Sequence, residues 1–175
     1  IADNFRRQIL EAEGRVFITS ISSNIIRWSQ AIEYGKSAGR KICVVGYSVD
    51  KAIKIAKELG YIKLTDADMV DVDRVKNFAD NKLMFLVAGF AGQPDSALSK
   101  MVMGKHKIKI KAGDKVIFSS PDYIPGTTGN IYEMIDILSK MAVSIFLWAD
   151  CFLNEPSHSF EKQLSFIIQE NPSQH

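Results

Sequence analysis

The chain has 175 residues, 46% of them hydrophobic and 10% aromatic, so it can bury one sizeable core and is not a disordered chain. Its formal net charge of +2 is too mild to indicate a nucleic-acid partner by itself. No apolar run approaches the ~20 residues of a membrane span and no signal peptide is recognisable, so we expect a cytoplasmic protein without a membrane partner.

The chain begins at Ile1 and not at Met, which indicates a piece of a longer protein. Its two cysteines, Cys43 and Cys151, match no metal or redox spacing, and Cys43 lies in an apolar run. We interpret both as reduced thiols, as expected in the cytosol. A disulfide between them is an alternative that the pattern does not support.

Helical periodicity and near-continuous apolar runs alternate along the chain. Ser22 or Ser23 is expected to cap the second helix and Gly39 to stop it. The aspartates of 66–73 match no calcium loop and are expected to cap a helix and solvate the surface. The predicted elements are, in order, a helix at 4–13, a strand at 15–20, a helix at 23–39, a strand at 41–46, a helix at 48–59, a short helix near 71–78, a strand at 82–88, a helix at 94–103, a strand at 115–119, a helix at 128–141 and a strand at 144–148.

Strands that are apolar on both faces and alternate with amphipathic helices are typical of a parallel sheet covered on both sides. We therefore predict an α/β fold with an open, mostly parallel sheet flanked by helices on both faces. In such sheets, ligands bind beyond the carboxyl ends of the strands. The strand-to-helix loops are thus the places where chemistry is expected.

Four of these loops share one character: SISSN (20–24), GYSVDK (46–51), AGFAGQPDS (88–96) and SSPDYIPGTTGN (119–130). Each sets Gly, Ser, Thr or Asn against a helix N-terminus, where unpaired backbone N–H groups and the helix dipole favour an anion. Together they predict a phosphate-binding rim. For any single loop the alternative is an ordinary N-cap or tight turn. None matches the P-loop or the dinucleotide fingerprint, so a nucleotide cofactor is not expected.

In order and spacing, these loops and their strands resemble the β-CASP domain of bacterial ribonuclease J, which belongs to the metallo-β-lactamase superfamily of RNA-processing nucleases. The resemblance covers about residues 3–143, so we assign 1–143 to this domain. It implies a domain inserted in a metallo-β-lactamase core, closing over it to form an RNA channel. Residues 144–175 are then the return segment toward that core, in divergent or truncated form.

The resemblance also implies a zinc-dependent ribonuclease, exo- and/or endonucleolytic, whose zinc ions and H-x-H-x-D-H motif belong to the core. No such motif occurs in this sequence. We therefore expect this chain to hold no metal and not to cleave RNA alone. The implied partners are RNA and the metallo-β-lactamase domain of the parent chain, with homo-oligomers formed through other domains.

The backbone devices of the family's motifs are kept here, whereas several side chains differ. The family's F-A-S-N corresponds to 21–24, with the last two residues retained, and its G-R-S to 46–48, without the arginine. Its T-G-S-Q-G-E-P corresponds to 88–94, with both glycines and the proline retained, and its S-S…I-P-G-N to 119–127, with Thr127 replacing asparagine. The RNA- or phosphate-binding residues that this implies are Ser119, Ser120, Gly126, Thr127, Gly89, Gly92, Ser23, Asn24 and Ser48.

The altered side chains leave two other functions open, a non-catalytic module that binds RNA or a protein, and a binder of small phosphate ligands. No catalytic residue is certain. In the tail, His158 falls on the second histidine of the family's H-x-S-G-H segment, which implies a role at the phosphate or catalytic edge. The alternative is a surface histidine near a helix start.

The lysine-rich stretch KHKIKIKAGDK alternates with period two, which predicts a strand with Lys107, Lys109 and Lys111 on one face and Ile108 and Ile110 on the other. That lysine face could track an RNA backbone by neutralising phosphates. The alternative is an edge strand whose lysines prevent aggregation.

Aromatic side chains in the loops are candidates for stacking on bases, namely Tyr47, Phe90 and Tyr123. Trp28 lies at core spacing within a helix and is expected in the core. His106 has no metal-like partner at a suitable spacing and is expected to be solvated.

Overall fold

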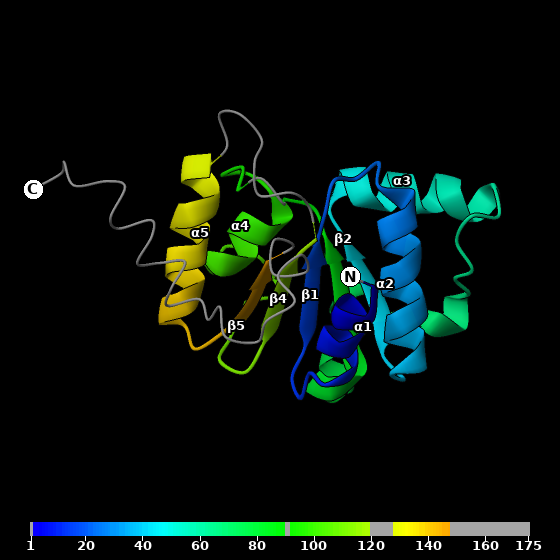
Figure 1. The fold of residues 1–175 in the computed structure, drawn as a ribbon, viewed down its shortest axis with the longest axis horizontal. Helices are drawn as coiled ribbons and strands as arrows, with labels where there is room; N and C mark the ends of the chain where they lie inside the picture. Colours follow the sequence, from blue (N-terminus) through cyan, green and yellow to red (C-terminus); the bar gives the residue numbers. More distant parts are fainter. Residues whose placement is uncertain (1, 90–91, 120–127, 148–175) are drawn as a thin grey trace, which may run out of the picture.

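The computed structural model describes residues 2–89, 92–119 and 128–147. Their strands form one parallel sheet in the order β2-β3-β1-β4-β5 (Figure 1). The predicted open α/β fold is confirmed, with every strand pair parallel. The strands are β1 (Val16–Thr19), β2 (Lys41–Val45), β3 (Leu83–Val87), β4 (Lys115–Phe118) and β5 (Ser144–Leu147). The helices are α1 (Ala2–Leu10), α2 (Ile25–Ser37), α3 (Tyr47–Glu58), α4 (Ala97–Val102) and α5 (Thr128–Lys140), with 3-10 turns η1 (Asp66–Asp68), η2 (Val72–Asn77) and η3 (Asp80–Lys82).

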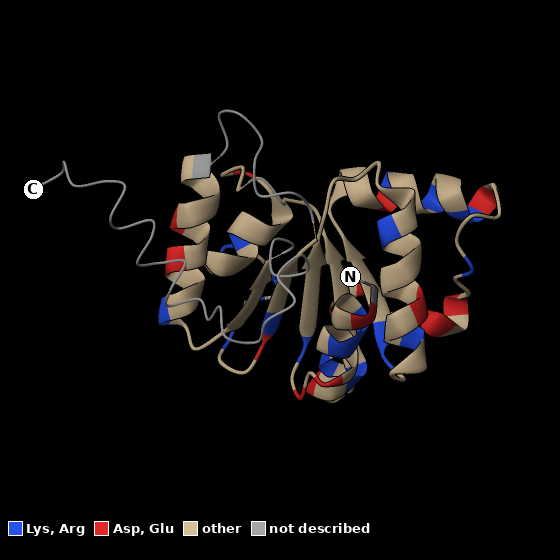
Figure 2. Cartoon of the chain, viewed as in Figure 1, with Lys and Arg blue, Asp and Glu red and all other residues tan. Residues whose placement is uncertain are grey.

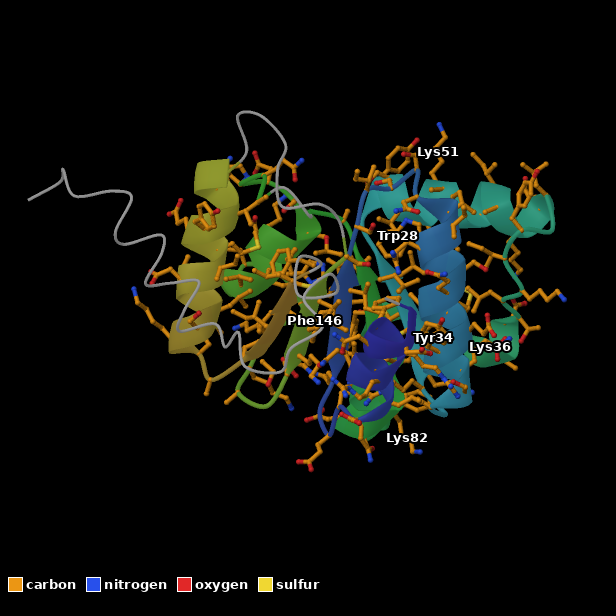
Figure 3. All side chains as sticks on the ribbon, viewed as in Figure 1. Trp28, Tyr34, Lys36, Lys51, Lys82 and Phe146 are labelled. Atoms are coloured by element: carbon orange, nitrogen blue, oxygen red, sulfur yellow. The ribbon has the colours of Figure 1, made fainter. Side chains whose placement is uncertain are left out.

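Both faces of the sheet are buried, and successive residues of each strand point to opposite faces. On β1, Val16 and Ile18 join the core under α1, α2 and α3, whereas Phe17 joins the core under α4 and α5. Phe17 stacks on its partner Phe85 of β3, with ring centroids 4.5 Å apart. Trp28 is fully buried between α2 and the sheet, as predicted (Figure 3).

The topology places a switch point between β1 and β4. The chain leaves β1 through α2 to reach β2, two places away on one side, and leaves β4 through α5 to reach β5 on the other side. The two connections use opposite faces of the sheet. In open α/β sheets, ligands bind beyond the strand ends at such a point.

The lysine-rich stretch is not a strand, so that prediction is wrong, although the alternation it rested on is present. Ile108 and Ile110 are each only 4% exposed, while the three lysines between and around them are exposed. Two side chains form hydrogen bonds with backbone groups that would pair with a neighbouring strand in a sheet. Arg15 Nη2 donates to the carbonyl of Lys109 at 2.7 Å, and Asp114 accepts from the N–H of Lys111 at 2.8 Å.

Helix starts also differ from the prediction. Asn24, and not Ser22 or Ser23, caps α2, since its side-chain oxygen accepts the N–H of Arg27 at 3.2 Å. The cap of α3 is Gly46, which offers no side-chain hydrogen bond. Helix α4 begins three residues later than predicted, and α1 both starts and ends earlier.

Cys43 is a free, buried thiol, as predicted, and Cys151 lies outside the described residues. Burial, with a smaller contribution from Asp71, raises the pKa of the Cys43 thiol to about 12. Since the thiolate is the nucleophilic form, Cys43 is a packing residue of β2.

Candidate functional site

The ends of β1 and β4 are joined at the switch point, at the upper edge of the sheet in Figure 1. The N–H of Ser119 donates to the carbonyl of Thr19 at 2.8 Å, and the hydroxyl of Ser20 donates to the carbonyl of Ser119 at 2.9 Å. All three residues are at most 2% exposed. The strand ladder therefore continues one residue past β4 and fixes Ser119, the first residue of the predicted rim.

Two hydroxyls at this edge are buried without a hydrogen-bond partner among the described residues, Thr19 Oγ1 and Ser119 Oγ. Buried polar groups are nearly always paired, so an orphaned hydroxyl needs an explanation. Thr19 follows Phe17 in register, on the α4–α5 side, and Ser119 follows Ile117, on the side of α2. Only Ser119 thus shares a face with the N-terminus of α2 and the predicted residues Ser23 and Asn24.

A second junction links the loops before α2 and α3. Ser22 Oγ donates to Ser48 Oγ at 2.9 Å, and Trp28 Nε1 donates to the carbonyl of Ser22 at 3.2 Å. Sequence reasoning named Ser48 but missed Ser22, which it treated only as a helix cap. A signal was present, since Ser22 and Ser48 each lie two or three residues past a predicted parallel strand, where loops meet at one edge.

The contacts of Asn24 and of the start of α4 favour the alternative that these loops are ordinary N-caps and turns. The Asn24 side-chain oxygen is already used by the N–H of Arg27. At α4, Ser96 caps the helix by accepting the N–H of Ser99, whose hydroxyl donates to the carbonyl of Gln93 at 2.8 Å. These groups stabilise their own turns and leave the exposed Ser23 and Ser48, with Ser119, as the described rim candidates on that face.

Gly89 and Gly92 are required by packing. Both have a positive φ, 123° and 69°. A Cβ on Gly92 would lie 2.6 Å from the backbone of Asn130 in the first turn of α5, and one on Gly89 would lie 2.6 Å from Cβ of Ser96. Gly89 therefore lets the β3–α4 loop pack against Ser96, and Gly92 lets it pack against α5. A role of either glycine in ligand binding is a separate proposal.

Replacing Gly92 by Ala is expected to lower the free energy of unfolding by about 2–4 kcal/mol, because backbone strain adds to a clash with backbone that cannot rotate away. Gly104→Ala is the matched control. Gly104 has a similar φ of 70°, but a Cβ there would meet nothing within 4 Å, so only the strain of ~1–2 kcal/mol remains. Equal losses in urea unfolding would show that the contact with α5 contributes nothing.

Several candidates lie outside the described residues, namely Ser120, Gly126, Thr127, Phe90, Tyr123 and His158. Tyr47, the described aromatic candidate, begins α3 and is 80% exposed. His106 is not fully solvated, since it is half-buried and its Nδ1 accepts the N–H of Ile108 at 3.0 Å. Within 2–89, 92–119 and 128–147, no three His, Cys, Asp or Glu residues cluster as metal ligands would.

Comparison with known proteins shows which family the sequence matches. The sequence model described as "Ribonuclease J, beta-CASP domain" matches residues 13–138. Ribonuclease J of Mycolicibacterium smegmatis is 33% identical over 168 residues, which are 95% of this chain and 30% of that protein. Ribonuclease J of Helicobacter pylori strain 26695 is 38% identical over 170 residues, 97% of this chain and 24% of that protein.

The chain thus spans less than a third of the length of these relatives. In the described part of the chain, no helix combines the length and apolar character needed to cross a bilayer. The matched range runs from just before β1 to near the end of α5 and so contains the switch point.

Proposed function

Because the chain belongs to the β-CASP domain family of ribonuclease J, we propose that it is the RNA-clamping domain of a ribonuclease J-like enzyme, with RNA bound at the carboxyl edge of the sheet. The parent protein hydrolyses RNA phosphodiesters, exo- and/or endonucleolytically. The catalytic core, including the metallo-β-lactamase fold, belongs to the part of the relatives that this chain does not span.

The observation that carries the proposal is the Ser119 hydroxyl, buried and without a partner among the described residues at the switch point. A phosphate oxygen is a strong acceptor for such a donor. The N-terminus of α2 lies on the same face and adds a favourable dipole. Ser23 and Ser48 extend the rim as exposed hydroxyls, and we propose that Gly89, Gly92, Ser120, Gly126 and Thr127 complete it.

The parent's metal is assigned outside this chain. The family resemblance implies zinc, but the described residues offer no cluster of ligands that would fit it. The role that these residues perform is to bind and orient the RNA backbone.

A non-catalytic binding module is the second candidate, and Asn24 favours it. The side-chain oxygen of Asn24 is engaged as a helix cap, and the motif arginine is replaced by Tyr47. A small phosphate ligand is a third candidate, but the described cavity nearest this edge, lined by Gly92, Asn130 and Met134 among others, holds only about 50 Å³. Ligand pockets usually hold 300–1,000 Å³.

The test is RNA binding by the full-length protein with Ser119→Ala. Loss of a hydrogen bond to a charged phosphate is expected to weaken binding of single-stranded RNA roughly tenfold, or ~1.5 kcal/mol. Ser139→Ala is the control, because Ser139 is exposed on α5 and bonds only within its helix, to the carbonyl of Ile135. Unchanged affinity in Ser119→Ala, alone and with Ser120→Ala, would remove these serines from the site.

Oligonucleotide length and a cleavage assay together separate the three candidate functions. An RNA channel should bind longer strands more tightly, with a steep dependence on salt, whereas a pocket for a small phosphate ligand should saturate on a mononucleotide. A binding module without catalysis should bind RNA with the same length dependence but leave it uncleaved when zinc is supplied to the full-length protein.

A further inference from the structure

A second cavity, of about 500 Å³, lies at the opposite end of the sheet, where the strands begin. Arg15 before β1 and Leu83 at the start of β3 line its base. One wall is η2, and the other is the lysine-rich stretch from Lys107 to Lys111. Its size is within the usual range of small-molecule sites.

The cavity is held in shape by contacts across it. Lys107 Nζ pairs with Asp73 at 2.7 Å, and Lys111 Nζ pairs with Asp80 at 2.6 Å, so the lysine-rich wall is tied twice to the opposite side. The same wall is anchored from below, because Arg15 donates to the carbonyl of Lys109 at 2.7 Å.

The lining carries an excess of positive charge. Five cationic side chains line the cavity, against two carboxylates, while Asp114, outside the lining, pairs with Arg15. In the described part of the chain, the two cations of this lining that form no salt bridge are Lys76 and Lys109. Figure 2 shows Lys and Arg together with Asp and Glu at this lower end of the molecule. The five cations are Arg15, Lys76, Lys107, Lys109 and Lys111.

The η2 wall carries apolar side chains beside the charged Asp73 and Lys76. Val72, Val75 and Phe78 line it and are only partly buried. A ligand that satisfies both walls needs an anionic group on one side and a flat or apolar body on the other. Inorganic phosphate lacks the body, and an apolar molecule lacks the charge.

We propose that this cavity binds a nucleotide, with the phosphate at Lys109 and the base on the Phe78 side. The nucleotide is either free or the end of an RNA strand, since both present the same chemistry. The site lies away from the carboxyl edge and does not rest on the RNA-clamping role proposed for that edge.

The test is calorimetric titration of the full-length protein with AMP, with adenosine and inorganic phosphate as partial ligands. Wild-type protein is expected to bind AMP more tightly than either part. Lys109→Gln and Phe78→Leu should each weaken AMP binding roughly tenfold, through loss of a charge-assisted contact and of ring contact. Lys51→Gln, an exposed lysine on α3 (Figure 3), should change nothing.

Two outcomes would overturn the proposal, AMP affinity unchanged by Lys109→Gln, or inorganic phosphate binding as tightly as AMP. A 5′-phosphorylated RNA that competes with AMP identifies the strand end as the source, and failure to compete identifies the free nucleotide. The Ser119→Ala variant should bind AMP like the wild type. A failed prediction at the carboxyl edge can therefore be told apart from a failed prediction for this cavity. A melting curve of each variant confirms that it is folded.

Discussion

Replacing Asp114 by Ala is expected to lower the free energy of unfolding by about 3–5 kcal/mol, because it leaves a buried cation without its partner. Arg15 donates to both carboxylate oxygens of Asp114, at 2.8 and 2.5 Å, and the two side chains are 10% and 1% exposed. Asp114 also accepts the N–H of Lys111. The substitution therefore frees a charge and a backbone donor together.

Urea unfolding of the variant against Asp136→Ala measures this effect. Asp136 pairs with Lys140 at 2.6 Å, but both side chains are more than half exposed, so its loss is expected to be below about 0.5 kcal/mol. Similar losses in the two variants would mean that burial of the Arg15 pair does not matter. The double substitution Arg15→Met with Asp114→Leu should recover much of the loss, because no unpaired charge remains.

The same pair shows why part of the fold could not be predicted from the sequence. The strands of the sheet were identified because their apolar residues are local signals, as in VFIT of β1. The lysine-rich stretch has an equally clear period of two, but it pairs with no strand. The carbonyl of Lys109 in this stretch is instead bonded by Arg15, 94 positions away in the sequence, and such a contact leaves no local trace.

Part of the candidate site could likewise be predicted from the sequence, and part could not. The position of Ser119 at the carboxyl edge followed from counting along a parallel sheet, and the structure places it there. Its orphaned hydroxyl depends on what surrounds it in three dimensions. The side-chain bond between Ser22 and Ser48 depends on how two loops lean together across the edge of β3. Neither could be read from spacing.

Trp28 joins the core to the candidate site, so its replacement is the second change with a large expected effect. Trp28→Ala should cost about 3–5 kcal/mol, since the side chain is fully buried and leaves a cavity. Trp28→Phe fills most of that space but removes the donor to the carbonyl of Ser22. A neutral hydrogen bond contributes ~1 kcal/mol, and the smaller ring adds a little, so about 1–2 kcal/mol is expected.

Comparison of the two variants by urea unfolding, with Ile26→Ala as the control, separates packing from positioning. Ile26 lies on the same helix but is 75% exposed, so its loss should be within about 0.5 kcal/mol. If Trp28→Phe were as destabilising as Trp28→Ala, the hydrogen bond and not the cavity would dominate.

Because Trp28→Phe releases Ser22, and Ser22 bonds Ser48, this mostly folded variant should also bind RNA more weakly. Unchanged RNA affinity would mean that the Ser22–Ser48 junction stabilises the loops without serving the RNA site.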